Sequence, residues 1–178
     1  MISLAAVLPA PAAQAASGKP PGNSVVWTGS YFSYPNRTSS ERTAIRNRVV
    51  NTINATWGRY VVDGEVHRGR IFMTTWSFND WGVRDALVNA VKRGTRVKII
   101  AAASVNTREH YKPWSSLRTA INKTTRGWSG VDASNTARQC SGACRGSAGT
   151  PHSKYFLFDD VGSSHQRNIV MQTSMNLT

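Results

Sequence analysis

The chain has 178 residues, which is long enough for one domain with a hydrophobic core and short for two. It carries 22 Lys and Arg against 9 Asp and Glu, so its formal net charge is +13. This balance favours anionic partners such as nucleic acid, acidic lipid surfaces or phosphate-bearing substrates, without choosing among them. No run of about 18 apolar residues occurs, which argues against a membrane-spanning helix.

The N-terminal region has the features of an export signal. Met1–Ala16 contains no charged side chain and ends in small residues, as the apolar region and cleavage site of a signal peptide do. The usual positively charged start is missing, so an unusual leader, a start further upstream and a disordered Ala/Pro-rich tail all stay open. We expect a signal peptide over 1–16, a flexible linker over 17–24 and a domain over 25–178 of a secreted protein.

The first predicted elements of the domain are a strand and a helix. Residues 25–32 predict a short edge strand, which the following Pro35 and Asn36 end. Residues 38–41 fit a capping box, and apolar residues recur every four positions from Ile45 to Trp57, which predicts an amphipathic helix. The arginines on its other face either guide a polyanion or form an ordinary solvated face.

Four further strands predict the sheet. Residues 70–76 and 97–102 read as strands joined by a helix that begins at residue 79 or 80 and ends at Gly94. Such a βαβ unit makes the two strands parallel, with a right-handed crossover. Strands over 155–159 and 168–173 complete the pattern. The predicted fold is therefore an α/β domain, with a mixed, mostly parallel β-sheet flanked by helices.

The stretch before the strand at 155–159 contains a basic, aromatic segment and a loop. Residues 107–128 are either a lid facing lipid or phosphate, or a plain amphipathic helix over 113–122. Residues 124–150 are rich in Gly, Ser and Thr and predict a long loop that leads into the site.

Two cysteines, Cys140 and Cys144, lie in this loop. In an exported protein we expect them to form a local disulfide, whereas in the cytosol they would be free thiols. The disulfide should stabilise the fold by less than the roughly 3 kcal/mol expected for a 15-residue loop, so its role would be to shape the approach to the site. Two cysteines without a matched pair of further ligands do not make a zinc site, so no metal is predicted.

The segment Pro151–Asp159 places polar residues in an apolar run at a spacing suited to chemistry. Its apolar part, 155–158, predicts a buried strand. His152 and Lys154 share one face of an extended chain, and Asp159 points to the other. An imidazole beside a fixed ammonium suits attack on a phosphoryl group, because the ring supplies a nucleophile or a proton and the cation holds the anionic oxygens.

The pattern His152-x-Lys154-x-x-x-x-Asp159 resembles the signature of the phospholipase D superfamily, often called the HKD family. The family's histidine attacks phosphorus and forms a phosphohistidine, its lysine binds phosphate oxygens, and no metal or other cofactor is required. The resemblance therefore implies that His152 is the nucleophile and Lys154 the phosphate clamp. Asp159, of opposite parity, is interpreted as support for the site.

Residues 172–178 resemble the second element of the same family, a Gly-Ser-x-Asn segment, with Thr173 in place of the usual glycine. Ser174 and Asn176 differ by two positions, so both can face one phosphate. The resemblance implies that they are further phosphate-binding residues.

The family mechanism needs a second histidine, which protonates the leaving group and then activates water. His67, His110 and His165 stand in no matching pattern. Small one-motif members of the family, typically nucleases, form a symmetric dimer, and larger members carry two motifs in one chain. Because the sequence stops at Thr178, directly after the second element, we expect the N-terminal half of a secreted bacterial-type two-motif enzyme, truncated at its C-terminus.

Three functions stay open at this point. The preferred one is a phospholipase D-like phosphodiesterase that hydrolyses phospholipid head groups. The second is a metal-independent endonuclease of the same superfamily that acts as a dimer, and the net charge of +13 favours it. The third is a catalytically inert domain that binds phosphate or nucleic acid through its basic surface.

Overall fold

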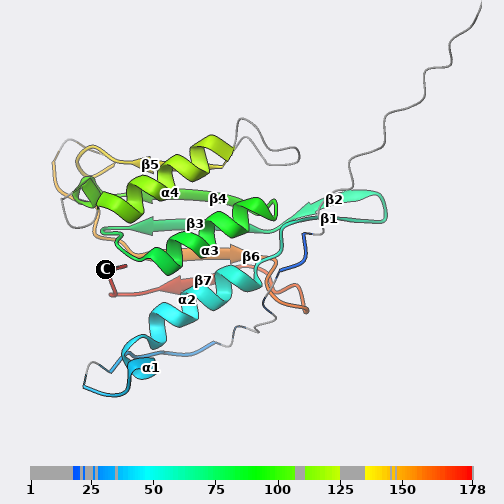
Figure 1. Cartoon of the computed structure of the whole chain (residues 1–178), viewed down its shortest axis with the longest axis horizontal. Coiled ribbons are helices and arrows are strands. Elements are labelled where there is room, and N and C mark those ends of the chain that lie inside the picture. Colours follow the sequence, from blue (N-terminus) through cyan, green and yellow to red (C-terminus); the bar gives the residue numbers. More distant parts are fainter. Residues whose placement is uncertain are drawn as a thin grey trace, which may run out of the picture.

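A sheet of five strands with helices on one face forms the centre of the computed structural model (Figure 1). The structure describes residues 18–20, 22, 26, 28–34, 36–106, 111–124, 135–144, 146 and 148–177. The predicted signal peptide, much of the predicted linker, part of the basic aromatic segment and His110 lie outside these residues.

The order of the strands in the sheet is β5-β4-β3-β6-β7. The strands are β3 (Arg70–Thr75), β4 (Arg96–Ala101), β5 (Thr136–Gln139), β6 (Tyr155–Asp159) and β7 (Ile169–Gln172). β3, β4 and β5 are mutually parallel, and β6 runs antiparallel to both of its neighbours, β3 and β7. Only β6 therefore opposes the common direction, which confirms the predicted mixed, mostly parallel sheet.

Three helices cover the same face of the sheet: α2 (Ala44–Ala55), α3 (Trp81–Lys92) and α4 (Tyr111–Thr124) (Figure 1). Burial alternates along the strands accordingly. In β3 the side chains of Ile71 and Met73 are buried under the helices, whereas Phe72 and Thr74, on the other face, are partly exposed. The main core lies between this face of the sheet and the helices.

The predicted βαβ unit is confirmed as β3, α3 and β4. Asp80 caps α3, because its Oδ1 accepts a hydrogen bond of 2.9 Å from the backbone N–H of Val83. Gly94 follows α3 with φ +91°, the left-handed conformation that glycine adopts without steric cost. β3 and β4 pair in parallel from Arg70 with Arg96 onward.

The N-terminal helix is confirmed but interrupted. The capping box at Thr38 is present, because the side chains of Thr38 and Glu41 each accept a hydrogen bond from the other's backbone N–H. The helix then divides at Thr43 into α1 (Ser39–Arg42) and α2. The edge strand predicted for 25–32 is wrong for its described part, since residues 28–32 form no strand.

Two strand elements were not predicted. β1 (Arg59–Val62) and β2 (Glu65–Arg68) form a hairpin that projects from the main sheet (Figure 1). Asp63 and Gly64 turn the hairpin, both with positive φ, as a tight two-residue turn requires. The prediction of a long loop over 124–150 is wrong for residues 136–139, because β5 lies there and extends the sheet beside β4.

Arg93 links α2 to α3 and provides a stability prediction. Its Nη2 donates hydrogen bonds to the carbonyls of Ile53 (3.1 Å) and Thr56 (3.3 Å), which end α2, and burial lowers the pKa of its guanidinium to about 10. Arg93→Met should lower the free energy of unfolding by about 1–3 kcal/mol, because these carbonyls lose their donor. Arg93→Lys, which keeps a cation, should lose less. Urea unfolding followed by circular dichroism measures both, and a methionine variant as stable as the parent would contradict this role.

Candidate active site

The two family-like segments meet at one edge of the sheet, where β3 ends and β6 begins. His152–Lys154 lead into β6, and Thr74, near the end of β3, pairs with Tyr155. The backbone N–H of Thr173 donates to the carbonyl of Lys154 at 3.0 Å, which continues the pairing of β6 with β7 by one step. Ser174 is therefore brought close to the His152–Lys154 segment.

Lys154 is the central side chain of this edge. It is buried, with 6% of its surface exposed, and its Nζ lies 3.2 Å from each ring nitrogen of His152 and 2.9 Å from the His152 carbonyl. The ring of Trp76 lies against both side chains, 4.9 Å from the imidazole ring and 5.7 Å from Nζ. His152 itself is exposed. A phosphate that reaches the imidazole would thus meet a cation that is already held in position.

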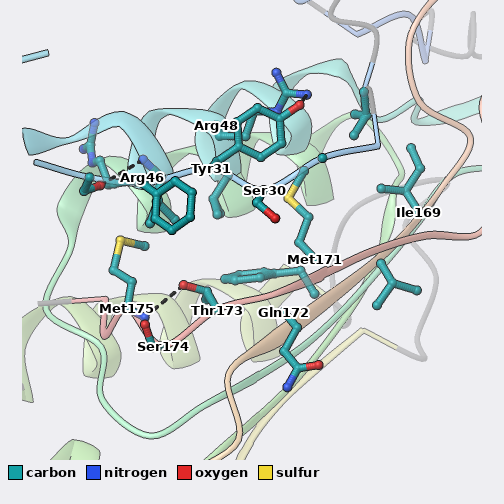
Figure 2. Close-up of a pocket in the computed structure, with 18 of the residues that line it drawn as sticks. Ser30, Tyr31, Arg46, Arg48, Ile169, Met171, Gln172, Thr173, Ser174 and Met175 are labelled. Carbon is teal, nitrogen blue, oxygen red and sulfur yellow. Dashed lines mark hydrogen bonds between the residues drawn. The ribbon is translucent and has the colours of Figure 1, made fainter. Parts of the chain in front are cut away.

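The second segment presents its polar groups beside this pair. Ser174 is exposed, and the Oδ1 of Asn176 is buried without a hydrogen-bond donor among the described residues. The Oγ1 of Thr173 accepts a hydrogen bond of 2.9 Å from the backbone N–H of Met175 (Figure 2). The threonine hydroxyl thus stabilises the turn that carries Ser174, so a side chain fits where the family usually has glycine.

Asp159 is not brought together with His152 and Lys154. It lies at the far end of β6, roughly 16 Å along the strand from Lys154 at about 3.3 Å per residue. Its carboxylate forms ion pairs with Arg70 (2.8 Å) and Arg167 (3.5 Å). The predicted opposite parity is confirmed, and the contacts of Asp159 are to arginines that hold neighbouring segments together.

Comparison with known proteins identifies the family. The sequence model described as "Cardiolipin synthase, PLD-like domain" matches residues 67–178, which is more than half of the chain. The chain belongs to this PLD-like family. The matched region includes every residue of the two segments described above. No sequence among the curated proteins matches the chain significantly.

Two solved structures resemble this PLD-like domain. NucT from Helicobacter pylori has a TM-score of 0.50 and 17% sequence identity, over 79% of this chain and 71% of that one. Nuc from Salmonella typhimurium, a phospholipase D family member, has a TM-score of 0.48 and 22% identity. The match covers 75% of this chain but 64% of Nuc, less than two thirds of its length. At these identities the likeness to NucT shows a shared fold.

A buried carboxylate that the sequence did not reveal lies at the other end of β6 in this PLD-like domain. Asp160 has no exposed surface, and its two oxygens accept hydrogen bonds of 2.6 Å from the Tyr60 hydroxyl and from Nδ1 of His165. Trp57 stacks on His165 at 4.7 Å, and Tyr60 stacks on His67 at 5.3 Å. Both histidines thus belong to a cluster remote from His152. Asp160 has a positive φ of 70°, and the turn-like sequence around it is the local signal that the sequence offered.

The cysteines of the PLD-like domain form the predicted disulfide, Cys140–Cys144. The backbone N–H of Cys140 donates to the carbonyl of Ala101 at 2.9 Å, at the ends of β4 and β5. These ends lie at the same edge of the sheet as the start of β6. The loop that precedes His152 is therefore constrained beside the candidate site.

In the described part of the PLD-like domain, no three His, Cys, Asp or Glu side chains gather as a metal site would require. Nor does any helix of that part combine the length and the apolar character that crossing a membrane requires.

Proposed function

We propose that this PLD-like domain supplies one half of the active site of a phosphodiesterase that hydrolyses phospholipid head groups, with His152 as the nucleophile. The observation that carries the proposal is the contact of the buried Lys154 ammonium with the exposed His152 imidazole. It combines a nucleophile that substrate can reach with a charge that needs no reorganisation when phosphate arrives. The predicted leader over residues 1–16 fits an enzyme that acts outside the cytoplasm.

In the proposed reaction a neutral ring nitrogen of His152 attacks phosphorus, and the bond from phosphorus to the leaving alcohol breaks. Lys154, Ser174 and Asn176 hold the phosphoryl oxygens. Water then attacks the phosphohistidine, releases the phosphate ester and restores the imidazole. The first step needs an acid that protonates the alcohol, and the second needs a base that takes a proton from water.

The proposed acid and base is a histidine from another HKD motif. Among the described residues, His67 and His165 lie in the cluster beside Tyr60, at the opposite end of β6 from His152. Neither can therefore reach a phosphate at His152 in the same chain. A second copy related by a twofold axis, or a second half of the same enzyme, would bring another histidine to the exposed edge.

A metal-independent nuclease is the second candidate. The net charge of +13 favours it, because phosphate-binding cations contribute most of the affinity for a nucleic-acid backbone. The same histidine and lysine would act on the phosphodiester bond of DNA. The substrate therefore separates the two candidates, whereas the chemistry does not.

The decisive experiment uses bis-p-nitrophenyl phosphate in EDTA. Its leaving group departs as a stable anion without protonation, so His152 of a single domain can react once even if the second histidine is absent. We expect a burst of nitrophenolate that approaches one per chain, together with an acid-labile phosphohistidine on residue 152. A folded protein that shows neither a burst nor turnover would contradict the proposal.

The same protein tests the substrate class, and its molecular mass in solution shows whether it is a monomer or a dimer. Where the protein turns over, we expect it to release head groups from vesicles of phosphatidylcholine and phosphatidylglycerol in EDTA. Cleavage of plasmid DNA under these conditions, without head-group release, would instead identify the nuclease.

A further inference from the structure

A large groove lies beside β7, the edge strand next to the candidate site. It has a volume of about 1090 Å³ and runs between β7, α2 and the segment 28–33 (Figure 2). This slightly exceeds the roughly 300–1,000 Å³ of small-molecule sites. The side chain of Gln166 fixes the position of Val26, whose backbone N–H and carbonyl it bonds at 2.7 and 3.0 Å, and so anchors the chain ahead of that segment.

Apolar side chains line one part of this groove, and polar side chains line the rest. The apolar side chains come from β6, β7, α2 and the turn after β7, and include Ile45, Val49, Phe156, Ile169, Met171 and Met175. Several are only partly covered: Ile169, Met171 and Met175 pack on the core yet keep exposed surface toward the groove. Methionine adapts its shape to irregular apolar ligands, so the apolar part of the groove suits an alkyl chain better than a rigid polar molecule.

One end of the groove meets the phosphate-binding segment. Ser174 and Asn176 line it, and the hydrogen bond from Thr173 N–H to the Lys154 carbonyl sets that end beside the HKD motif. A phosphodiester held between Lys154 and Ser174 would therefore have one of its two ester substituents at the mouth of the groove.

The segment opposite β7 carries exposed aromatic rings. Tyr31, Phe32 and Tyr34 are 44%, 65% and 51% exposed. Arg48 fixes the first of them, because its guanidinium lies 4.3 Å over the Tyr31 ring and donates to the Tyr31 hydroxyl at 2.7 Å. Exposed aromatic rings beside arginine are typical of surfaces that meet phospholipid at the boundary between water and hydrocarbon.

The charges around the groove also favour phospholipid. Asp80 is the one acidic residue among the described lining residues, and Arg46 neutralises it through contacts of 2.7 and 3.0 Å. Arg42 and Arg48 then leave the groove with a positive character. Lipid phosphates are attracted to such a rim.

We propose that this groove binds a hydrocarbon chain of the lipid substrate, and that Tyr31, Phe32 and Tyr34 form the lip through which the chain enters from the lipid surface. The inference rests on the proposed function and specifies its substrate: the diacylglycerol side of a phospholipid occupies the groove, while the phosphate lies at His152 and Lys154. The aromatic lip makes contact with the membrane surface, and the exposed site edge then receives the head group.

The test measures binding of single-chain alkyl phosphocholines, all below their micelle concentrations, by titration calorimetry. Each added methylene that the groove buries should strengthen binding about three- to fourfold, as expected from about 0.8 kcal/mol per buried CH₂. Met171→Trp, which fills the groove, should weaken binding of the longest chain at least tenfold. Ile100→Trp is the matched control, because Ile100 is 48% exposed on another strand and does not line the groove.

A second variant keeps the test open if Met171→Trp fails to fold. Phe32→Ser changes an exposed side chain and should lower binding to anionic vesicles at least fivefold, with thermal unfolding unchanged. Affinity that does not depend on chain length, or equal losses in Met171→Trp and Ile100→Trp, would overturn the groove. Vesicle binding by Phe32→Ser equal to that of the parent would overturn the lip.

The reaction with bis-p-nitrophenyl phosphate separates this inference from the proposed function, because that substrate has no alkyl chain. A burst at His152, with alkyl phosphocholine binding that does not depend on chain length, would support the phosphodiesterase and reject the lipid groove. Binding that depends on chain length, without a burst, would support a lipid-binding groove beside an inert site.

Discussion

Replacing His152 by alanine should reduce nitrophenolate release from bis-p-nitrophenyl phosphate by about 10⁴-fold or more and should remove the phosphoprotein. The methyl group of alanine offers no lone pair to phosphorus, and the substitution also removes the contact between the imidazole and Lys154. His152 is exposed, so its loss should leave the thermal unfolding midpoint nearly unchanged. Stopped-flow absorbance and mass spectrometry of the quenched protein measure the two effects.

The adjacent Ser153 offers the matched control. It is exposed, and its backbone carbonyl accepts a hydrogen bond of 3.4 Å from Thr74 Oγ1. Ser153→Ala should keep the burst within about twofold of the parent, because it keeps that carbonyl and surface substitutions rarely alter the fold. A His152→Ala protein that still forms the phosphoprotein would assign the nucleophile to another residue.

Lys154→Met should slow the reaction with bis-p-nitrophenyl phosphate but leave His152 in place as the nucleophile. Methionine fills a similar buried volume but removes the charge beside the phosphoryl oxygens, so the burst should slow by about 10²–10³-fold. Its amplitude should still approach one per chain, because His152 is present. Lys154→Arg restores a cation with a different shape and should recover part of the rate. A methionine variant with the parent's burst rate would contradict a role in binding phosphate.

The parts of the fold that the sequence predicts are those with strong local signals. Asp80 caps a helix whose apolar residues recur with helical spacing, so α3 could be located closely. β6 follows from an uninterrupted apolar run, and its register places His152 and Lys154 together. The disulfide follows from two nearby cysteines and a predicted export signal. In each case the deciding interactions join residues close in sequence.

The parts that escaped prediction depend on distant residues or on very short elements. β5 has only four residues and gains its stability from pairing with β4. The sequence of β5 alone does not predict this pairing. The bond between Tyr60 and Asp160 joins residues 100 positions apart. The groove likewise needs Val26 and Gln166, 140 positions apart, to meet. Single-sequence patterns carry no information on such pairings, which explains why Asp160 was missed while its neighbour Asp159 was chosen.

Asp160→Ala should lower the free energy of unfolding by about 3–5 kcal/mol, the effect expected when one partner of a buried charged contact is removed. The substitution takes the acceptor away from the Tyr60 hydroxyl and from His165 Nδ1, each at 2.6 Å. It also places alanine at φ 70°, where Asp and Asn are tolerated better. Asp160→Asn keeps the shape, that backbone preference and one acceptor, so it should lose about 1–2 kcal/mol. Urea unfolding at neutral pH measures both, and equal losses would show that the carboxylate itself contributes little.

The free energy of unfolding at alkaline pH tests the contribution of the Tyr60 hydroxyl to its contact with Asp160. Burial, with the hydrogen bond to Asp160 as the next cause, raises the pKa of Tyr60 from 10.0 to about 12. Between these values the unfolded chain releases the phenol proton and the folded chain keeps it, so unfolding is favoured increasingly as pH rises. This contribution is fully present below pH 10.0 and is lost as pH rises through about 12. Tyr60→Phe, measured against Tyr155→Phe on the open face of β6, should be less stable at neutral pH yet lose less stability over the alkaline interval. An alkaline slope in Tyr60→Phe as steep as in the parent would show that another group causes it.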